Sequence, residues 1–314
     1  MSAGMTDTPL LTARSVSKMF GLVRALNEID LELGPGVTGL LGPNGSGKST
    51  LLKLFAGQLR PDTGSVRLQG RDPFEEPAAL KALGLCPEQD KFYEDLPGHA
   101  FVEALTRLHG YSAAEAQRRA LDAMNRVGMG RDGAKRMREM SRGMRQRTKI
   151  AQAIAHDPAV VLLDEPLNGA DPVARADLIR LVQSLGDEGR CVVVSSHVLH
   201  EVESMTHRVV LIRFGRLRAQ GDFLRLRELI ENRPYRIRIE VPDARALAAE
   251  LLRQGHVRAV EVQAEDRLEI TTTQIDAACQ DVPAIAQRLG VLVTGFTSPD
   301  ADLESLYRYL MHDA

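Results

Sequence analysis

The sequence lacks several features that would indicate a secreted or nucleic-acid-coating protein. Tryptophan is absent, and the three cysteines, Cys86, Cys191 and Cys279, lie far apart with no Cys-x-x-Cys pair. This cysteine usage favours reduced thiols packed as small apolar groups over disulfides or a zinc site. The formal net charge is only −2, so no overall basic field favours binding to nucleic acid.

Long apolar runs are also missing. Residues 159–163 are strongly apolar, but a membrane helix needs about 20 such residues, so we expect a buried strand there. Residues 1–9 are small and polar without the apolar centre of a signal peptide, which predicts a loose N-terminal tail. With 314 residues of ordinary soluble composition, the chain has room for one large domain and one small domain.

Residues 42–50 match the phosphate-binding pattern G-x-x-x-x-G-K-[ST]. Its glycines let backbone N–H groups approach phosphate, Lys48 reaches the β- and γ-phosphates, and the Ser49 hydroxyl completes a Mg²⁺ shell. An expected strand at 37–41 enters this loop, and an expected helix at 49–56 leaves it with its N-terminus toward the anion. The sequence therefore predicts a nucleoside triphosphate site formed by Gly42, Pro43, Asn44, Gly45, Ser46, Gly47, Lys48, Ser49 and Thr50.

Two adjacent carboxylates follow the apolar run at 160–163. Asp164 is expected at the C-terminal end of a buried strand, where open α/β sheets bind ligands, and would hold Mg²⁺. Glu165 beside it is placed to accept a proton from an attacking water, which favours hydrolysis over binding alone. A solvated strand end is the alternative for an isolated Asp-Glu pair, but the phosphate loop upstream favours the functional interpretation.

The order of elements predicts two domains. Short alternating strands at 10–35 and a strand at 65–69 surround the phosphate loop, and helical periodicity dominates residues 97–157. Strands and helices then alternate through residues 160–212, which indicates a parallel sheet flanked by helices.

The composition changes after about residue 232. We expect the strands and helices there in the order β-α-β-β-α-β, which suggests a ferredoxin-like domain. The expected strands are 235–241, 257–262, 268–272 and 291–296, and the expected helices are 244–253, 283–289 with Pro283 in its first turn, and a last helix at 303–311.

Taken together, these motifs resemble the ATP-binding subunit of an ABC transporter over about residues 10–230. The family's Leu-Ser-Gly-Gly-Gln signature corresponds to residues 140–144, Met-Ser-Arg-Gly-Met. The resemblance implies that Ser141, Arg142 and Gly143 face the γ-phosphate of ATP bound by the opposite subunit. Ser141 also has the character of a helix N-cap. Arg142 and Met144 depart from the family pattern in the manner of its drug and polysaccharide exporter branch.

Four further residues take their roles from the resemblance. Gln89 matches the glutamine that meets Mg²⁺ and water in a loop touching the membrane subunit. Asp171 would bridge the dimer, although it also suits the N-cap of a helix beginning at residue 172. His197 matches the histidine that contacts the γ-phosphate, and Phe20 stands where an aromatic ring stacks on adenine. Ordinary structural roles are the alternatives for all four.

The resemblance implies an α/β cassette of the P-loop NTPase class, with a mixed sheet, a helical subdomain at about 97–157 and N-terminal antiparallel strands. We predict a tail at 1–9, this cassette at 10–232 and an accessory α+β domain at 233–314. Two copies, most simply a homodimer, would enclose ATP and Mg²⁺ and drive separate transmembrane permease subunits, with the chain peripheral at the cytoplasmic face of the cell membrane. The accessory domain would serve dimer contacts or regulation.

Other functions are left open by the residues themselves. A soluble ABC-type ATPase acting on ribosomes or DNA is one alternative, a regulatory binding module is another, and the partner could be a different, degenerate subunit. Residues 131–149 hold eight basic and two acidic residues, a density that can bind nucleic acid. Because no aromatic residue interleaves them, we expect a solvated helical face near the nucleotide phosphates and no nucleic-acid partner.

Overall fold

The computed structural model describes residues 9–228, 234–298, 303–304 and 307. The chain divides into two compact units, Met1–Gly221 and Asp222–Ala314. The domain boundary expected at 232/233 and all but the last residue of the tail expected at 1–9 lie outside the described residues. Within the described ranges, no helix is both long and apolar enough to cross a membrane.

The first unit is built on a six-stranded sheet in the order β5-β6-β7-β3-β8-β9. Neighbouring strands from β5 to β8 run parallel, and β9 follows β8 through a turn at Phe214 and Gly215. The strands are β3 (Gly36–Leu41), β5 (Leu83–Cys86), β6 (Val160–Asp164), β7 (Cys191–Ser196), β8 (Arg208–Arg213) and β9 (Arg216–Asp222).

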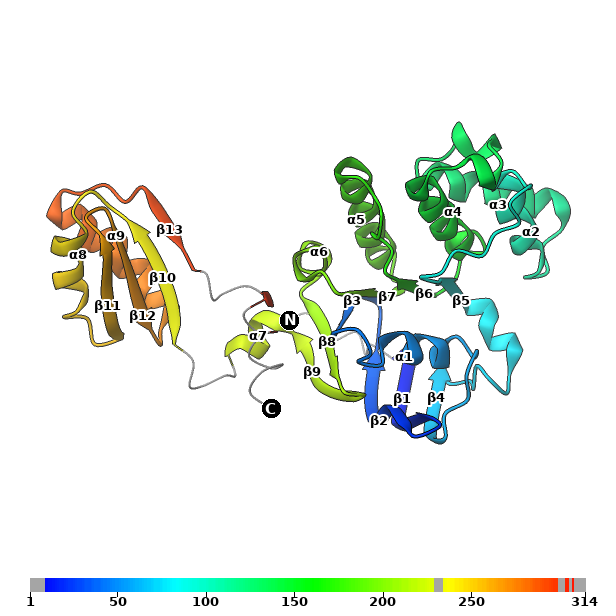
Figure 1. Cartoon of the computed structure of the whole chain (residues 1–314), viewed down its shortest axis with the longest axis horizontal. Helices are drawn as coiled ribbons and strands as arrows, with labels where there is room; N and C mark the ends of the chain where they lie inside the picture. Colours follow the sequence, from blue (N-terminus) through cyan, green and yellow to red (C-terminus); the bar gives the residue numbers. More distant parts are fainter. Residues whose placement is uncertain (1–8, 229–233, 299–302, 305–306, 308–314) are drawn as a thin grey trace, which may run out of the picture. The chain divides into compact units, whose positions relative to one another are not determined.

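The central strands are buried on both faces, as their unbroken apolar sequence predicts. Val160 and Leu162 of β6 join one core cluster, while Val161 and Leu163 join the other, because successive side chains of a strand point to opposite faces. Figure 1 shows the two layers that these clusters hold to the sheet. One layer carries α5 (Pro172–Asp187) and the helical lobe, and the other carries α1 (Lys48–Phe55) with a second sheet.

The second sheet is antiparallel in the order β2-β1-β4. Its strands are β1 (Leu11–Phe20), β2 (Val23–Leu33) and β4 (Thr63–Leu68). The helical lobe consists of α2 (Gly98–Arg107), α3 (Ala113–Arg126) and α4 (Arg142–Ile154), with short 3₁₀ turns at Asp132–Ala134 and Met137–Glu139. Outside the lobe, a 3₁₀ turn at Pro77–Ala82 precedes β5, and α6 (Leu199–Met205) precedes β8. The prediction of an α/β fold that mixes parallel and antiparallel strands is confirmed.

Register brings three segments that carry predicted site residues to one edge of the parallel sheet. Leu41, the last residue of β3, pairs with Ser196 of β7. Asp164, the last residue of β6, pairs with Ser195. Because parallel strands all end at the same edge, the phosphate loop, Asp164–Glu165 and His197 emerge side by side there.

The second unit contains a four-stranded antiparallel sheet in the order β11-β12-β10-β13. Two helices complete the element order β-α-β-β-α-β, and its core includes Ile237, Leu247 and Ile285. The elements are α7 (Phe223–Glu228), β10 (Tyr235–Glu240), α8 (Ala244–Leu251), β11 (Val257–Ala264), β12 (Arg267–Thr272), α9 (Ile275–Leu289) and β13 (Gly295–Thr297).

The start of the helix predicted at 283–289 and the place of its proline were wrong. Helix α9 begins at Ile275, so Pro283 lies inside the helix and not in its first turn. The buried residues Ala278, Val282 and Ile285 follow a helical spacing that extends through the proline. Pro283 itself is exposed, so its ring faces solvent, and without an N–H it cannot donate the helical hydrogen bond to residue 279.

The strand expected at 291–296 is shorter than predicted, because the first residues of that range form the C-terminal cap of α9. Gly290 takes a left-handed conformation with φ of 70°, and the Val291 N–H bonds to Ala286 O in a Schellman motif. Only Gly295–Thr297 forms a strand. Of the helix expected at 303–311, residues 303, 304 and 307 are helical and the others lie outside the described residues.

Candidate active site

The phosphate loop connects β3 to α1 and has the backbone shape that its glycines permit. Gly47 has φ of 111°, and a Cβ atom there would lie 2.6 Å from Ala25 O, so a larger residue would displace the backbone. The Ser46 hydroxyl is buried and has no hydrogen-bond partner among the described residues. Such an orphaned donor fits a site whose partner is a ligand oxygen, because buried polar groups are otherwise paired.

Lys48 is folded back over this loop. Its ammonium donates to Gly42 O at 2.6 Å and Pro43 O at 3.3 Å, and the residue is only 7% exposed. Burial lowers the pKa of Lys48, while the negative charges of Glu165 and Asp164 act in the opposite direction. The ammonium is therefore held by carbonyl oxygens that a phosphate group could replace.

Ser195, to which the sequence motifs assign no role, links Asp164 to Glu165. The buried Ser195 hydroxyl donates to Asp164 Oδ1 and accepts the Glu165 N–H at 3.0 Å. Glu165 itself adopts a left-handed backbone conformation with φ of 49°, which is strained for a residue with a side chain. Ser195 thus holds the Asp164 carboxylate directly and restrains Glu165 through its backbone.

His197 lies beside Glu165, with Nδ1 3.0 Å from Glu165 Oε2. The histidine side chain is 52% exposed, whereas that of Glu165 is 12% exposed. Burial raises the pKa of Glu165, and the hydrogen bond from His197 partly offsets that rise. A carboxylate with a raised pKa is a stronger proton acceptor, which is the property needed to activate water.

The predicted Mg²⁺ ligands supply oxygen donors of the kind that Mg²⁺ prefers. Ser49 lies in the first turn of α1 and Asp164 at the end of β6, where the phosphate loop also emerges. Gln89 is exposed in the loop that follows β5, the strand paired with β6. No cluster of three or more His, Cys, Asp or Glu side chains that could hold a metal occurs among the described residues. The donor set fits Mg²⁺ that is also bound by phosphate oxygens.

The signature segment begins α4, and the prediction that Ser141 is the helix N-cap is confirmed. The Ser141 hydroxyl accepts the Met144 N–H at 3.3 Å. Arg142 lies against the segment after β6, since a Cβ at Gly169 would be 2.4 Å from Arg142 Nε. Asp171 caps α5 by accepting the Ala174 N–H at 2.9 Å, and this hydrogen bond lowers the pKa of Asp171.

Arg142 belongs to a polar cavity of about 230 Å³ that contains no residue of the phosphate loop. Its walls come from the loop after β5, from α4 and from the segment after β6. The lining residues are Glu88, Gln89, Asp90, Arg142, Gln146, Lys149 and Asn168. Within one chain, therefore, the cavity brings Gln89 and Arg142 together but does not join the signature to the phosphate loop.

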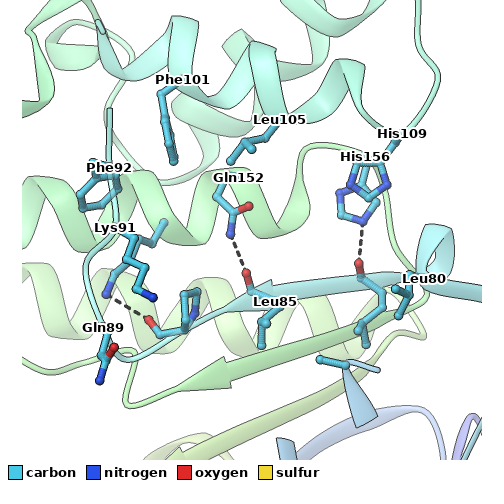
Figure 2. Close-up of a pocket in the computed structure, with 14 residues that line it drawn as sticks. Leu80, Leu85, Gln89, Lys91, Phe92, Phe101, Leu105, His109, Gln152 and His156 are labelled. Atoms are coloured by element: carbon cyan, nitrogen blue, oxygen red, sulfur yellow. Dashed lines mark hydrogen bonds between the residues drawn. The ribbon is translucent and has the colours of Figure 1, made fainter. Parts of the chain in front are cut away.

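A second, more apolar groove of about 350 Å³ opens between β5 and the helical lobe (Figure 2). Its apolar lining includes Leu80, Leu85, Phe92, Phe101 and Leu105. At one end the rings of His109 and His156 stack with centroids 3.7 Å apart. Burial, together with neighbouring His109, lowers the pKa of His156 to about 4, so this pair is neutral near pH 7.

Most of the basic residues at 131–149 are exposed, as expected, but three of them also bind another segment of the chain. Arg145 makes a bidentate pair with Glu94 at 2.8 and 2.7 Å, and Arg138 pairs with Asp95 at 2.7 Å. Lys149 is 4% exposed and pairs with Asp90. These three cations bind the acidic loop after β5 because it packs along α4, a tertiary contact that local sequence does not reveal.

Phe20 ends β1 and is 49% exposed. The Lys18 ammonium lies 5.9 Å from the centroid of its ring. An exposed ring at the end of a strand is free to stack on a planar ligand, so the geometry is compatible with the adenine contact that the sequence predicts.

Comparison with known proteins places this geometry in a family. The family described as ABC transporter matches residues 26–168. The daunorubicin/doxorubicin resistance ATP-binding protein DrrA of Streptomyces peucetius is 30% identical over 96% of this chain and 92% of its own. The daunorubicin resistance ATP-binding protein DrrA3 of Streptomyces coeruleorubidus is 35% identical over 69% of each chain. A solved ATP-binding subunit of an ABC transporter superposes with a TM-score of 0.65 at 25% identity, covering 70% of this chain and 92% of that one.

Proposed function

The chain belongs to the ABC transporter family as a subunit that binds and hydrolyses ATP, and from this premise we propose that two copies enclose ATP and Mg²⁺ to drive export through separate membrane subunits. One observation carries the proposal. Ser195 links Asp164 and Glu165 at the sheet edge where the phosphate loop emerges, with His197 against Glu165.

Export is favoured by the relatives and by the extent of the similarity. The name of the Streptomyces peucetius relative refers to resistance to daunorubicin and doxorubicin, and the similarity to it spans 304 residues, so it includes the second unit. We propose a related role here, in which the chain acts at the inner face of the cell membrane against permease subunits encoded separately. The Gln89 loop and the groove beside it would receive a cytoplasmic segment of such a subunit.

The residues of this chain divide the chemistry among themselves. The backbone of residues 42–50 and Lys48 hold the β- and γ-phosphates, and Ser49, Asp164 and Gln89 would hold Mg²⁺. When bound, Mg²⁺ neutralises charge that develops on the phosphate oxygens. Glu165 accepts the proton of the attacking water, while Ser195 directs its backbone and His197 orients its carboxylate. Phe20 stacks on the adenine ring.

The signature segment completes the site of a second copy rather than its own. Ser141 and Gly143 begin α4, whose N-terminus favours a negative group, yet the cavity next to Arg142 contains no phosphate-loop residue of the same chain. We propose that each ATP lies between residues 42–50 of one copy and Ser141, Arg142 and Gly143 of the other, with Asp171 at the dimer contact. Hydrolysis removes the γ-phosphate and releases the dimer.

A mixing experiment tests this arrangement. Lys48→Ala removes the phosphate contact and Ser141→Arg obstructs the signature, so each pure variant should hydrolyse ATP at below about 1% of the wild-type rate. Equal mixing gives heterodimers in half of the pairs, each with one intact composite site of two, so we expect about a quarter of the wild-type rate. The rate of phosphate release from the mixed full-length proteins measures this recovery of hydrolysis.

The control is a mixture of Lys48→Ala with Glu165→Gln. Both changes lie on the same side of the composite site, so their heterodimer has no intact site and the rate should stay near background. A mixture of Lys48→Ala and Ser141→Arg that also stays at background would refute the shared-site arrangement.

The raised pKa of Glu165 predicts a pH dependence. A general base must be deprotonated, so the hydrolysis rate should fall as the pH drops through that pKa. Because the His197 hydrogen bond lowers the Glu165 pKa, His197→Ala should raise it and move the acidic limb of the rate profile to higher pH, with a plateau rate at least about tenfold lower. Steady-state rates between pH 5 and 9 measure the midpoint of this acidic limb. The control is His200→Ala, a change at an exposed histidine. An unmoved midpoint in His197→Ala would contradict the effect of the His197 hydrogen bond on Glu165.

The second unit has the strand order of a ferredoxin-like domain. With β10 as its first strand, the sheet order β11-β12-β10-β13 reads 2-3-1-4, and every neighbouring pair is antiparallel. We propose this fold for residues 233–314 and the ATPase cassette for 10–232, with the accessory domain contributing to dimer contacts or regulation.

A further inference from the structure

Lys149 is a buried cation whose contacts surround Gln89. Its ammonium donates to Pro87 O at 3.1 Å and Glu88 O at 3.0 Å, and it lies 2.7 Å from Asp90 Oδ1. The side chain is only 5% exposed. An ammonium carries three donors, and here all three have acceptors on the residues immediately before and after Gln89.

These contacts fix the backbone at Gln89 without restraining its side chain. Gln89 is exposed. Both Gln89 and Lys149 lie between two cavities. Among the described residues, these two alone line both the polar cavity next to Arg142 and the apolar groove in Figure 2. Any shift of the Lys149 ammonium therefore moves the wall that separates the groove from the polar cavity.

Lys149 also belongs to the signature helix. It lies on α4, which begins directly after Ser141, and two further cations of the same region bind the loop farther along, at Glu94 and Asp95. A regular helix moves as a unit, so displacement of Ser141 and Gly143 is carried to Lys149 through the hydrogen bonds of α4. Among the described residues of α4, only Lys149 forms hydrogen bonds and an ion pair with the residues next to Gln89.

We propose that Lys149 is a positioning residue that joins the Gln89 loop to the signature helix, so that Gln89 takes up its place at the nucleotide only when α4 is in its closed position. The proposal rests on the proposed function, because it assigns Lys149 an effect on hydrolysis through Gln89. Lys149 touches neither nucleotide nor water in this role, and its effect should disappear when Gln89 is removed.

The test compares Lys149→Met, Gln89→Ala and the double variant in the full chain. Met keeps the length of the side chain and removes the cation. We expect each single change to lower kcat for Mg²⁺-ATP about tenfold and to leave KM for ATP within about twofold, since residues 42–50 are untouched. The double variant should be no slower than the slower single variant, because both changes remove the same function of Gln89.

Arg145→Met is the matched control on the same helix, one turn before Lys149. It breaks the ion pair with Glu94, five residues beyond Gln89, and so removes a cation of α4 that binds the same loop. We expect its kcat to stay within about twofold of wild type. If Lys149→Met does not fold, Asp90→Asn weakens the same cluster from an exposed position and should lower kcat about two- to threefold, again with no further effect in Gln89→Ala.

A spectroscopic measurement separates positioning from general loss of structure. The chain contains no tryptophan, so Phe92→Trp places a single tryptophan on the loop, against Phe101 in the groove. Mg²⁺-ATP should change its emission when Lys149 is present. In Lys149→Met the emission should be shifted to the red before ATP is added, and the ATP response should fall at least fivefold, while the thermal unfolding of the lobe persists.

The outcomes distinguish the two proposals. Lys149→Met with wild-type kcat, or kcat losses that multiply in the double variant, would overturn the role of Lys149 and leave the proposed function intact. A Gln89→Ala variant that hydrolyses ATP normally would remove Gln89 from the proposed site, and the Lys149 proposal with it. A loop tryptophan that responds equally with and without Lys149 would also overturn it.

Discussion

Glu165→Gln is expected to reduce ATP turnover at least about 100-fold while the protein still binds Mg²⁺-ATP and forms a stable dimer. A general base contributes about 10² to 10⁴ to a rate, and the amide that replaces the carboxylate cannot accept a proton. Gln has nearly the same shape, and the backbone N–H at this position would still bond Ser195. Removing a negative charge next to the γ-phosphate also lessens repulsion in the closed dimer.

Phosphate release and light scattering in Mg²⁺-ATP measure the two halves of this prediction. Glu203→Gln, on the neighbouring helix α6, is the matched control and should hydrolyse ATP normally without accumulating dimer. Substantial turnover by Glu165→Gln would place the base elsewhere. A variant that binds ATP and remains monomeric would mean that a different subunit completes the site, or that Arg142 and Met144 prevent the signature from doing so.

The parts of this site that the sequence predicts are those with a fixed spacing and a fixed place on the sheet. The phosphate loop, Asp164 and Glu165 follow apolar strands, and parallel strands that end at one edge must bring them together. The helix caps Ser141 and Asp171 are equally local, since each serves an N–H group three residues away. Such features require no knowledge of which segments meet across the fold.

Ser195 and Lys149 could not be found in this way. Each acts on residues far away in the chain, Ser195 on Asp164 and Lys149 on the segment around Gln89. A serine at a strand end and a lysine in a charged helix are both common, and only tertiary packing makes them buried and specific. One signal was available for Lys149, because it lies at helical spacing from Gln146, Ile150 and Ala153, which are among the buried residues of α4.

Lys48→Met is expected to weaken Mg²⁺-ATP binding at least about 100-fold and to abolish measurable hydrolysis. Lys48 is the one basic residue within the phosphate loop, and Glu165 and Asp164 act on its charge. Without it, those carboxylates repel the triphosphate. The same change should alter the stability of the nucleotide-free protein little, because the ammonium is buried against only two carbonyl oxygens and Met fills a similar volume.

Thermal unfolding with and without Mg²⁺-ATP separates these effects. At a ligand concentration 100 times Kd, binding stabilises a folded protein by about 2.7 kcal/mol, so the wild-type midpoint should rise clearly and that of Lys48→Met should barely move. Lys53→Met, an exposed lysine at the end of α1, should behave as wild type in both conditions. If Lys48→Met unfolds much earlier without nucleotide, Lys48 holds the loop together as well as the phosphate. If it gains as much from Mg²⁺-ATP as the wild type does, the binding energy comes from the backbone N–H groups of residues 42–50, and the lysine acts on the reaction alone.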